Sequence, residues 1–274
     1  MSKATSAVRH AAQTPDALDP DKIRSRLRTK RLGKKVIVYN STSSTNDIAA
    51  EYARSKDNDG LVVLAEEQTR GRGRGGNKWV SGKGDSILCS ILLAECRLSV
   101  ELLPLITAVA VAEAIGKCVK AEAKIKWPND IILNNKKTAG IIVESKKTGG
   151  NATCIIGIGI NCHQRKKDFP TDLQKTATSI DIETGAVTDR ISLIKRLLTS
   201  VEHWIEIAEQ KEQKVVERWQ KLSTQLHHRV AIVYNRKRFV GNCIGVDPQH
   251  GLILQLDTGG VRMFDAAHTT IAKE

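Results

Sequence analysis

The sequence predicts an α+β protein, with a mixed sheet flanked by helices and a small β-barrel at the C-terminal end. Two observations predict this architecture. Between residues 36 and 224, apolar runs of strand length alternate with longer stretches at helical spacing. After Gln225 the pattern changes to short strands separated by turns. We therefore expect a partly flexible N-terminal arm (1–35), a main domain (36–224) and a barrel domain (225–274).

The expected helices follow from apolar periodicity and from capping residues. Ser44 or Thr45 is suited to cap the second of them, because both hydroxyl side chains can accept a hydrogen bond from a free backbone N–H. Pro104 suits the first turn of the third, where its missing N–H has no consequence. In chain order, the expected helices are Asp21–Lys30, Asp47–Arg54, Pro104–Val119 and one or two helices over Ile191–Trp219.

The expected strands are short apolar or alternating runs bounded by turn residues. Thr148–Asn151, with two central glycines, is a hairpin signal between two of the longer strands, and Asp247–Gly251 is a second turn. The strands of the main domain are expected at Val36–Tyr39, Leu61–Ala65, Ser86–Ala94, Lys124–Trp127, Ile131–Leu133, Thr138–Ser145 and Thr153–Ile160. Those of the barrel are expected at Val230–Tyr234, Phe239–Val246, Leu252–Leu256 and Val261–Phe264.

Composition narrows the class of protein. The 274 residues carry a formal net charge of +13, which favours an anionic partner: nucleic acid, a membrane surface, nucleotide phosphates or an acidic protein. The longest uncharged apolar run, Leu102–Ala112, is too short to cross a bilayer, and the first 19 residues lack the apolar stretch of a secretory signal. The six cysteines form no CxxC pair, so we expect buried free thiols in the cytoplasm.

One segment breaks every periodic pattern. Gln68–Gly84 is rich in glycine and basic residues, and its centre, Gly71–Trp79, alternates glycine with arginine. Glycine lets the backbone approach a ligand closely, and guanidinium groups bind anionic oxygens. An RG-rich nucleic-acid tail and a plain solvated loop are the alternatives. Because the segment lies between two buried strands and ends in a tryptophan, we expect a mobile loop that a ligand orders.

Three further motifs are individually weak. Lys126–Asp130 (KWPND) brings together a cation, an amide and a carboxylate, although Pro-Asn-Asp is also ordinary turn chemistry. Lys137–Gly140 leads into a strand, where the lysine could equally be a charge at a hairpin tip. Gly157–Asn161 places glycines in an apolar strand, which indicates close approach of a ligand or tight core packing.

Taken together and in this order, the motifs resemble those of the biotin protein ligases. The resemblance also includes Ser44–Asn46 and Gln68, and it covers residues 36–274. It implies a class II synthetase-like core with an SH3-like C-terminal barrel. The implied activity is synthesis of biotinyl-5′-AMP from biotin and ATP with Mg²⁺, then transfer of biotin to a lysine of a biotin carboxyl carrier protein. Neither a specific nucleic acid nor a membrane is an implied partner, and the implied assembly is a monomer or a homodimer.

The resemblance also implies roles for individual residues. Lys137, Arg74 and Asp130 correspond to the catalytic positions, and no metal ligand is assigned, because Mg²⁺ arrives with ATP. The biotin-binding positions correspond to Ser44, Thr45, Asn46, Gln68, Arg72, Gly73, Arg74 and Lys137. The ATP-binding positions correspond to Arg74, Trp79, Lys126, Asn129 and Asn161.

The sequence departs from the family pattern at two places, and two other functions compete with the one implied. Gly75 stands where many relatives have Arg or His, and the C-terminus lacks the arginine that some relatives place near the nucleotide. Lipoate ligases share the fold but lack the Gly-Arg loop followed by KWPND. Some biotin ligases also act as DNA-binding repressors through a winged helix, for which we expect the residues before position 36 to be too few.

Overall fold

The computed structural model describes residues 16–119, 122–148 and 151–272. Its core is a seven-stranded mixed sheet in the order β1-β2-β3-β7-β6-β5-β4, in which β1 and β2 are parallel and the other neighbours antiparallel. This arrangement confirms the predicted α+β class. The strands are β1 (Val36–Tyr39), β2 (Val62–Ala65), β3 (Ser86–Cys96), β4 (Lys124–Lys126), β5 (Asp130–Leu133), β6 (Lys136–Thr148) and β7 (Asn151–Asn161).

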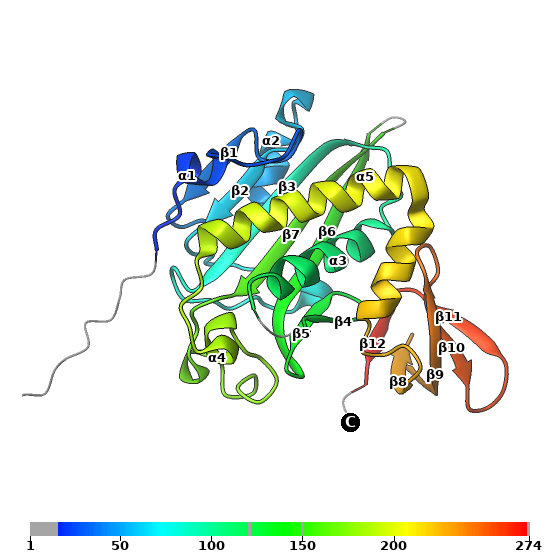
Figure 1. Ribbon diagram of the computed structural model, residues 1–274. Helices are drawn as coiled ribbons and strands as arrows, with labels where there is room; N and C mark the ends of the chain where they lie inside the picture. The colour runs from blue at the N-terminus through cyan, green and yellow to red at the C-terminus, as the bar shows by residue number, and fades with distance from the viewer. Residues whose placement is uncertain (1–15, 120–121, 149–150, 273–274) are drawn as a thin grey trace, which may run out of the picture.

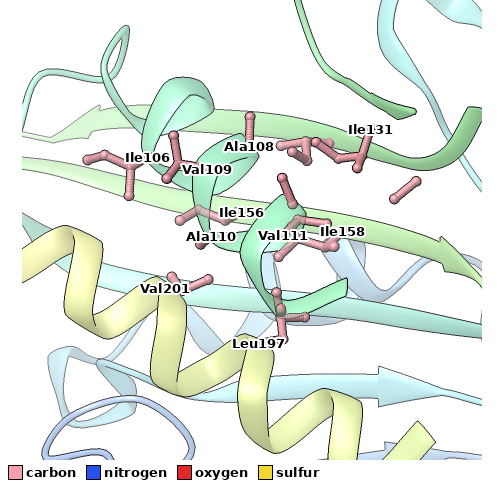
Figure 2. Close-up of a cluster of buried hydrophobic side chains, with 14 of the residues drawn as sticks. Ile106, Ala108, Val109, Ala110, Val111, Ile131, Ile156, Ile158, Leu197 and Val201 are labelled. Atoms are coloured by element: carbon pink, nitrogen blue, oxygen red, sulfur yellow. The ribbon is translucent and has the colours of Figure 1, made fainter. Parts of the chain in front are cut away.

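Two helices cover one face of this sheet (Figure 1). α3 (Leu103–Gly116) packs against the sheet and against α5 (Arg190–Leu222), which lies beside it on the same face, and α3 is apolar on almost all sides. Figure 2 shows this packing: Val109 and Val111 of α3 lie among isoleucines of the sheet on one side and Leu197 and Val201 of α5 on the other. α2 (Thr45–Tyr52) contacts β2, β3 and β7 on the opposite face and leaves part of that face open.

α5 is interrupted at Lys211, whose φ of −150° and ψ of 77° are not helical. The long helix therefore consists of two segments, and the second runs toward the C-terminal sheet (Figure 1). The prediction of one or two helices in this region is confirmed. The side chain of Asp189 caps the start of α5 by accepting a hydrogen bond from the backbone N–H of Ser192 at 3.0 Å.

The C-terminal part is a five-stranded antiparallel sheet in the order β11-β10-β9-β8-β12. The predicted boundary between residues 224 and 225 lies between the end of α5 and the start of β8. Closure of this sheet into an SH3-like barrel stays a prediction. The strands are β8 (Arg229–Tyr234), β9 (Lys237–Asp247), β10 (Gly251–Leu256), β11 (Val261–Phe264) and β12 (Thr269–Ile271).

The helix predicted over Asp21–Lys30 is wrong in extent. α1 spans only Pro20–Arg24, and Arg26 adopts a left-handed φ of 57°. The chain that follows is held instead by the carboxylate of Glu202 on α5, which accepts a hydrogen bond from the backbone N–H of Leu32 at 2.7 Å. This tertiary contact replaces helical hydrogen bonds. Of the predicted arm, residues 1–15 lie outside the described residues, whereas Leu18, Ile23 and Leu32 are buried in the core.

Several smaller differences concern boundaries and short elements. Ser44 occupies the N-cap position of α2, but its side chain makes no capping hydrogen bond. β6 and β7 pair as the hairpin that was predicted, with the two central turn residues outside the described ranges. α4 (Ile180–Thr184), β12 and the 3₁₀ turns η1 (Lys56–Asn58), η2 (Arg74–Gly76) and η3 (Lys166–Asp168) were not predicted, because three to five residues are too few for periodicity to register.

All six cysteines are free, and five are buried as predicted, while Cys118 is exposed. Among the described residues, no helix combines the length and the apolar character needed to span a bilayer.

Candidate functional site

The open part of the sheet face that α2 leaves uncovered is the floor of a cavity of about 450 Å³. Side chains alternate between the two faces of a strand. In β7, the side chains of Ile156, Ile158 and Ile160 therefore belong to the hydrophobic core, and Gly157 and Gly159 face the cavity. The apolar run with two glycines is therefore one strand, with its isoleucine side chains buried on one face and no side chains on the face that a ligand can approach.

The glycines are required by the side chains that lie on them. A Cβ at Gly159 would come within 2.5 Å of Cε2 of Trp79, and one at Gly140 of β6 within 3.0 Å of Cζ3 of the same ring. A Cβ at Gly157 would meet Oδ1 of Asn46 at 2.5 Å. These distances are shorter than van der Waals contact, so only glycine allows the indole and the amide to lie against the sheet.

One end of the cavity is a hydrogen-bonded group of neutral polar side chains at the start of α2. Oε1 of Gln68 accepts hydrogen bonds from the backbone N–H of Thr45 at 2.7 Å and from its hydroxyl at 2.9 Å. The hydroxyl of Ser90 on β3 lies 2.7 Å from Oγ1 of Thr45 and 2.5 Å from Oδ1 of Asn46. Nδ2 of Asn46 is buried and has no hydrogen-bond partner among the described residues. This end therefore holds polar groups that a polar ligand can engage.

The other end is cationic. Nζ of Lys137 lies 2.5 Å from Oδ1 of Asp130 and 5.8 Å from the ring centroid of Trp79. Arg74 donates a hydrogen bond from Nη2 to the carbonyl oxygen of Thr269 at 2.8 Å. Burial lowers the pKa of Arg74 below its ordinary value, because the charge has lost water without gaining a carboxylate in contact. An anion placed beside this guanidinium would restore the lost stabilisation.

The Gly-Arg segment lines one side of the cavity. The backbone N–H of Gly73 donates to the carbonyl oxygen of Asn77 at 2.7 Å, and Gly75 and Gly76 take left-handed φ values of 65° and 81°. The guanidinium of Arg72 is held at the rim by Asp47 at 2.6 Å and by Glu144 at 3.1 Å. Its hydrogen bond to Asp47 raises the pKa of Arg72 above the ordinary value.

The cavity brings together most of the residues singled out in the sequence, from segments far apart in the chain. Those that line it are Ser44, Thr45, Asn46, Gln68, Arg72, Gly73, Arg74, Trp79, Asn129, Asp130 and Lys137.

Two predicted ATP-binding residues lie apart from this lining. Lys126 is exposed on β4, which is the edge strand of the sheet. Asn161 is buried in a separate polar cluster, where its Nδ2 donates to the carbonyl oxygen of Thr178 at 3.0 Å and its Oδ1 accepts from Gln164 at 3.2 Å. Its amide is therefore already engaged by protein groups.

The contribution of the C-terminal sheet to the cavity was not predicted from the sequence. Residues 267–270, at the start of β12, line the cavity, and the carbonyl oxygen of Thr269 accepts a hydrogen bond from Arg74 although 195 positions separate the two. Ser90 was also missed, because a serine within an apolar strand carries no recognisable signal. Lys78 adds a further cation to the lining, and the basic character of the loop was the signal that could have identified it.

Comparison with known proteins agrees with this geometry. Residues 38–161 match the sequence model of the Biotin/lipoate A/B protein ligase family. The "Bifunctional ligase/repressor BirA" of Bacillus subtilis is 31% identical over 259 residues, which cover 92% of this chain and 79% of that protein. The chain belongs to the biotin protein ligase family. A "Biotin--[acetyl-CoA-carboxylase] ligase" of Mycobacterium tuberculosis is 32% identical over 200 residues, covering 68% of this chain and 72% of that one.

The fold of this family member also has solved counterparts. The biotin protein ligase of Aquifex aeolicus in complex with biotin and ATP superposes with a TM-score of 0.74 at 23% identity. The alignment covers 88% of this chain and 100% of the Aquifex chain. At that identity the likeness establishes the shared fold, and the roles of single residues rest on the geometry described above.

Proposed function

We propose that this protein makes biotinyl-5′-AMP from biotin and ATP and transfers the biotinyl group to a lysine of an acceptor protein. The observation that carries the proposal is the division of one cavity into a neutral hydrogen-bonding end and a cationic end. Biotin has the matching polarity, because its ureido ring is neutral and polar while its valerate chain ends in a carboxylate. Family membership and the matched geometry point to the same ligand.

In the first step a carboxylate oxygen of biotin attacks the α-phosphorus of ATP, and the bond from that phosphorus to the bridging oxygen of pyrophosphate breaks. Two anions must meet, so cations have to offset their repulsion. Lys137 is suited to this role, since its ammonium group lies inside the cavity on a strand, and Arg74 offers a partly desolvated second charge.

In the second step the neutral amine of the acceptor lysine attacks the carbonyl carbon of the mixed anhydride. AMP leaves and the amine loses a proton. Asp130 is the acidic residue among the described residues that line the cavity, and we assign it to orient Lys137 and to receive the incoming amine.

Both substrates fit the residues present. The buried Nε1 of Trp79 has no partner among the described residues, and its indole lies against the glycine floor, where an aromatic ring can stack with a planar base. Mg²⁺ would enter with ATP and would neutralise phosphate charge. No three His, Cys, Asp or Glu side chains within residues 16–119, 122–148 and 151–272 converge as a metal site.

Pyrophosphate exchange tests the first step. With labelled pyrophosphate, ATP and Mg²⁺, we expect label to enter ATP when biotin is added and not when lipoate is added. Exchange that depends on lipoate alone would replace this proposal with the lipoate ligase alternative.

For the acceptor, we propose a biotin carboxyl carrier protein with an acidic surface, because a net charge of +13 speeds encounter with an anionic partner. The kcat/KM for the acceptor should then fall steeply with salt while adenylate formation changes little. Equal salt sensitivity of both steps would remove the reason for this assignment. Because its cysteines are free thiols, we place the protein in a reducing compartment such as the cytoplasm.

A further inference from the structure

Lys137 faces the cavity against the alternation of its own strand. In β6, Ala139 and Ile141 belong to the hydrophobic core, and Gly140 between them faces the cavity. Continued toward the start of the strand, this alternation would turn Lys137 toward the core. Lys137 instead lines the cavity, and its Nζ lies 3.4 Å from the position that a Cβ on Gly140 would occupy. A local irregularity at the start of β6 therefore directs the lysine to the cavity face.

The irregularity is a β-bulge. Ile131 of β5 pairs with Ala139, whereas the next residue, Ile132, pairs with Lys137. Thr138 is therefore an extra residue on β6, and an extra residue turns the side chain that adjoins it to the other face of the sheet. A bulge also interrupts the ladder of hydrogen bonds, so the chain at Lys137 needs support from elsewhere.

The support comes from the segment that precedes α4. The pairing of β6 with β7 begins at Ala139, so β7 does not reach Lys137. The backbone N–H of Lys137 donates instead to the carbonyl oxygen of Thr176 at 2.7 Å, and its carbonyl oxygen accepts from the N–H of Thr178 at 2.9 Å. These two hydrogen bonds form a parallel bridge between Lys137 and Ala177. A segment outside the seven-stranded sheet thus holds the bulge.

Glu183 of α4 fastens this segment to the turn between β5 and β6. Its Oε1 accepts a hydrogen bond from the hydroxyl of Thr178 at 2.6 Å, and its Oε2 accepts one from Nδ2 of Asn134 at 2.6 Å. Nζ of Lys136 lies 4.0 Å from Oε1. The side chain of Glu183 is only 10% exposed and does not line the cavity. Its carboxylate therefore closes a ring of contacts around the bulge from outside the cavity.

We propose that Glu183 is a positioning residue that keeps the ammonium group of Lys137 directed into the cavity. Resting on the biotin ligase function proposed above, its role is to fix this charge before biotin and ATP arrive. A charge that is already in place stabilises the transition state without reorganisation during the reaction. A displacement of such a group by ~1 Å can cost about 10²-fold in rate. Without the carboxylate, Thr178 and Asn134 are no longer joined, and the bulge is free to relax.

The first test replaces Glu183 and measures biotin-dependent pyrophosphate exchange. Rates are divided by the number of sites that retain added biotinyl-5′-AMP, so unfolded protein does not contribute. Glu183→Ala should lower kcat per site by roughly 10–100-fold, and no further than Lys137→Ala does, with the KM for biotin nearly unchanged. Glu183→Gln keeps one acceptor oxygen and should lose less.

The second test removes one donor to Glu183 and preserves the turn. Asn134 has a left-handed φ of 48°, which glycine adopts readily, so Asn134→Gly loses the hydrogen bond without straining the backbone. Its kcat per site should fall about tenfold. Asn235→Gly is the matched control, because Asn235 has the same φ in the turn between β8 and β9 and does not line the cavity. Added to Glu183→Ala, Asn134→Gly should cause no further loss, because both variants remove the same contact.

The outcomes separate this inference from the proposed function. Absence of any biotin-dependent exchange by the wild-type protein would refute the proposed function itself. Normal wild-type exchange together with an unchanged kcat per site in Glu183→Ala would overturn only the role of Glu183. Equal losses in Asn134→Gly and Asn235→Gly, or additive losses in the double variant, would also overturn it, because turn flexibility would then account for the effect. If Glu183→Ala does not fold, the comparison of the two asparagine variants decides alone.

Discussion

Replacing Gly159 by alanine tests whether the bare floor of the cavity positions Trp79. The backbone of Gly159 tolerates alanine, since its φ is not in the left-handed region, so the consequence is confined to space. The new methyl group would lie 2.5 Å from Cε2 and 2.7 Å from Cζ2 of Trp79. Carbon atoms prefer about 3.5–4.0 Å, so the indole must move by ~1 Å or more.

The magnitude depends on how freely the ring can move. Overpacking of a closed core costs roughly 1–3 kcal/mol. Trp79 is only half-buried and belongs to a loop, so it can swing away, and we expect the free energy of unfolding to fall by about 1 kcal/mol or less. The larger effect should fall on ligand binding, because the displaced ring no longer covers the floor beside Lys137. We expect the KM for ATP to rise about tenfold, which corresponds to ~1.4 kcal/mol.

The assay combines urea unfolding with pyrophosphate exchange. Gly116→Ala, at the end of α3, is the control, because the added Cβ has no neighbouring side chain within 4 Å. This variant should raise the free energy of unfolding by roughly 0.5–1 kcal/mol and leave the rate of pyrophosphate exchange unchanged. In a Trp79→Ala background, Gly159→Ala should have no further effect on the KM for ATP. An unchanged KM in the single variant, or an equal loss in both backgrounds, would refute the proposed contact.

Three further predictions concern charge. Lys137→Ala should lower the rate of adenylate formation by about 10²–10³-fold in a folded protein, because one positioned charge is lost at the reacting phosphorus. Pyrophosphate exchange at a near-wild-type rate would contradict the catalytic role assigned to Lys137. Arg74→Gly should still form adenylate but release it roughly 10–100-fold faster, because the loop loses the hydrogen bond from Arg74 to the carbonyl oxygen of Thr269. The measurement is biotin incorporation into albumin in the absence of the acceptor protein. Labelling of albumin no faster than with the wild-type protein would exclude Arg74 as the residue that retains the adenylate. The ring of His163 donates a hydrogen bond to the carboxylate of Asp181, and this contact raises the pKa of His163 above its ordinary value of 6.5. The contribution of this contact to stability is complete below pH 6.5 and is lost as the pH rises through the folded-state pKa. The difference in Tm between wild type and His163→Gln should therefore shrink from about pH 6 to pH 8, and a constant difference would contradict this reasoning.

Much of the main domain could be predicted because its signals are local. The alternation of isoleucine and glycine in Ile156–Ile160 already contains a buried face and a bare face, and strand geometry converts it into core and cavity floor. The apolar stretch that became α3 is similar, since its composition alone requires burial on all sides. The short basic helix failed because the carboxylate that replaces its hydrogen bonds comes from Glu202, far along the chain.

The sequence by itself therefore determined the fold class, the family and the residue types of the cavity, because motif order and periodicity are written in neighbouring residues. Only the tertiary structure decided which of them face one another. It set Lys126 on an edge strand and engaged Asn161 within the protein, and it brought Thr269 to Arg74 and Ser90 beneath Asn46. The physical reason is that strand register and the packing of distant segments fix these contacts, and neither leaves a signal at the single residue concerned.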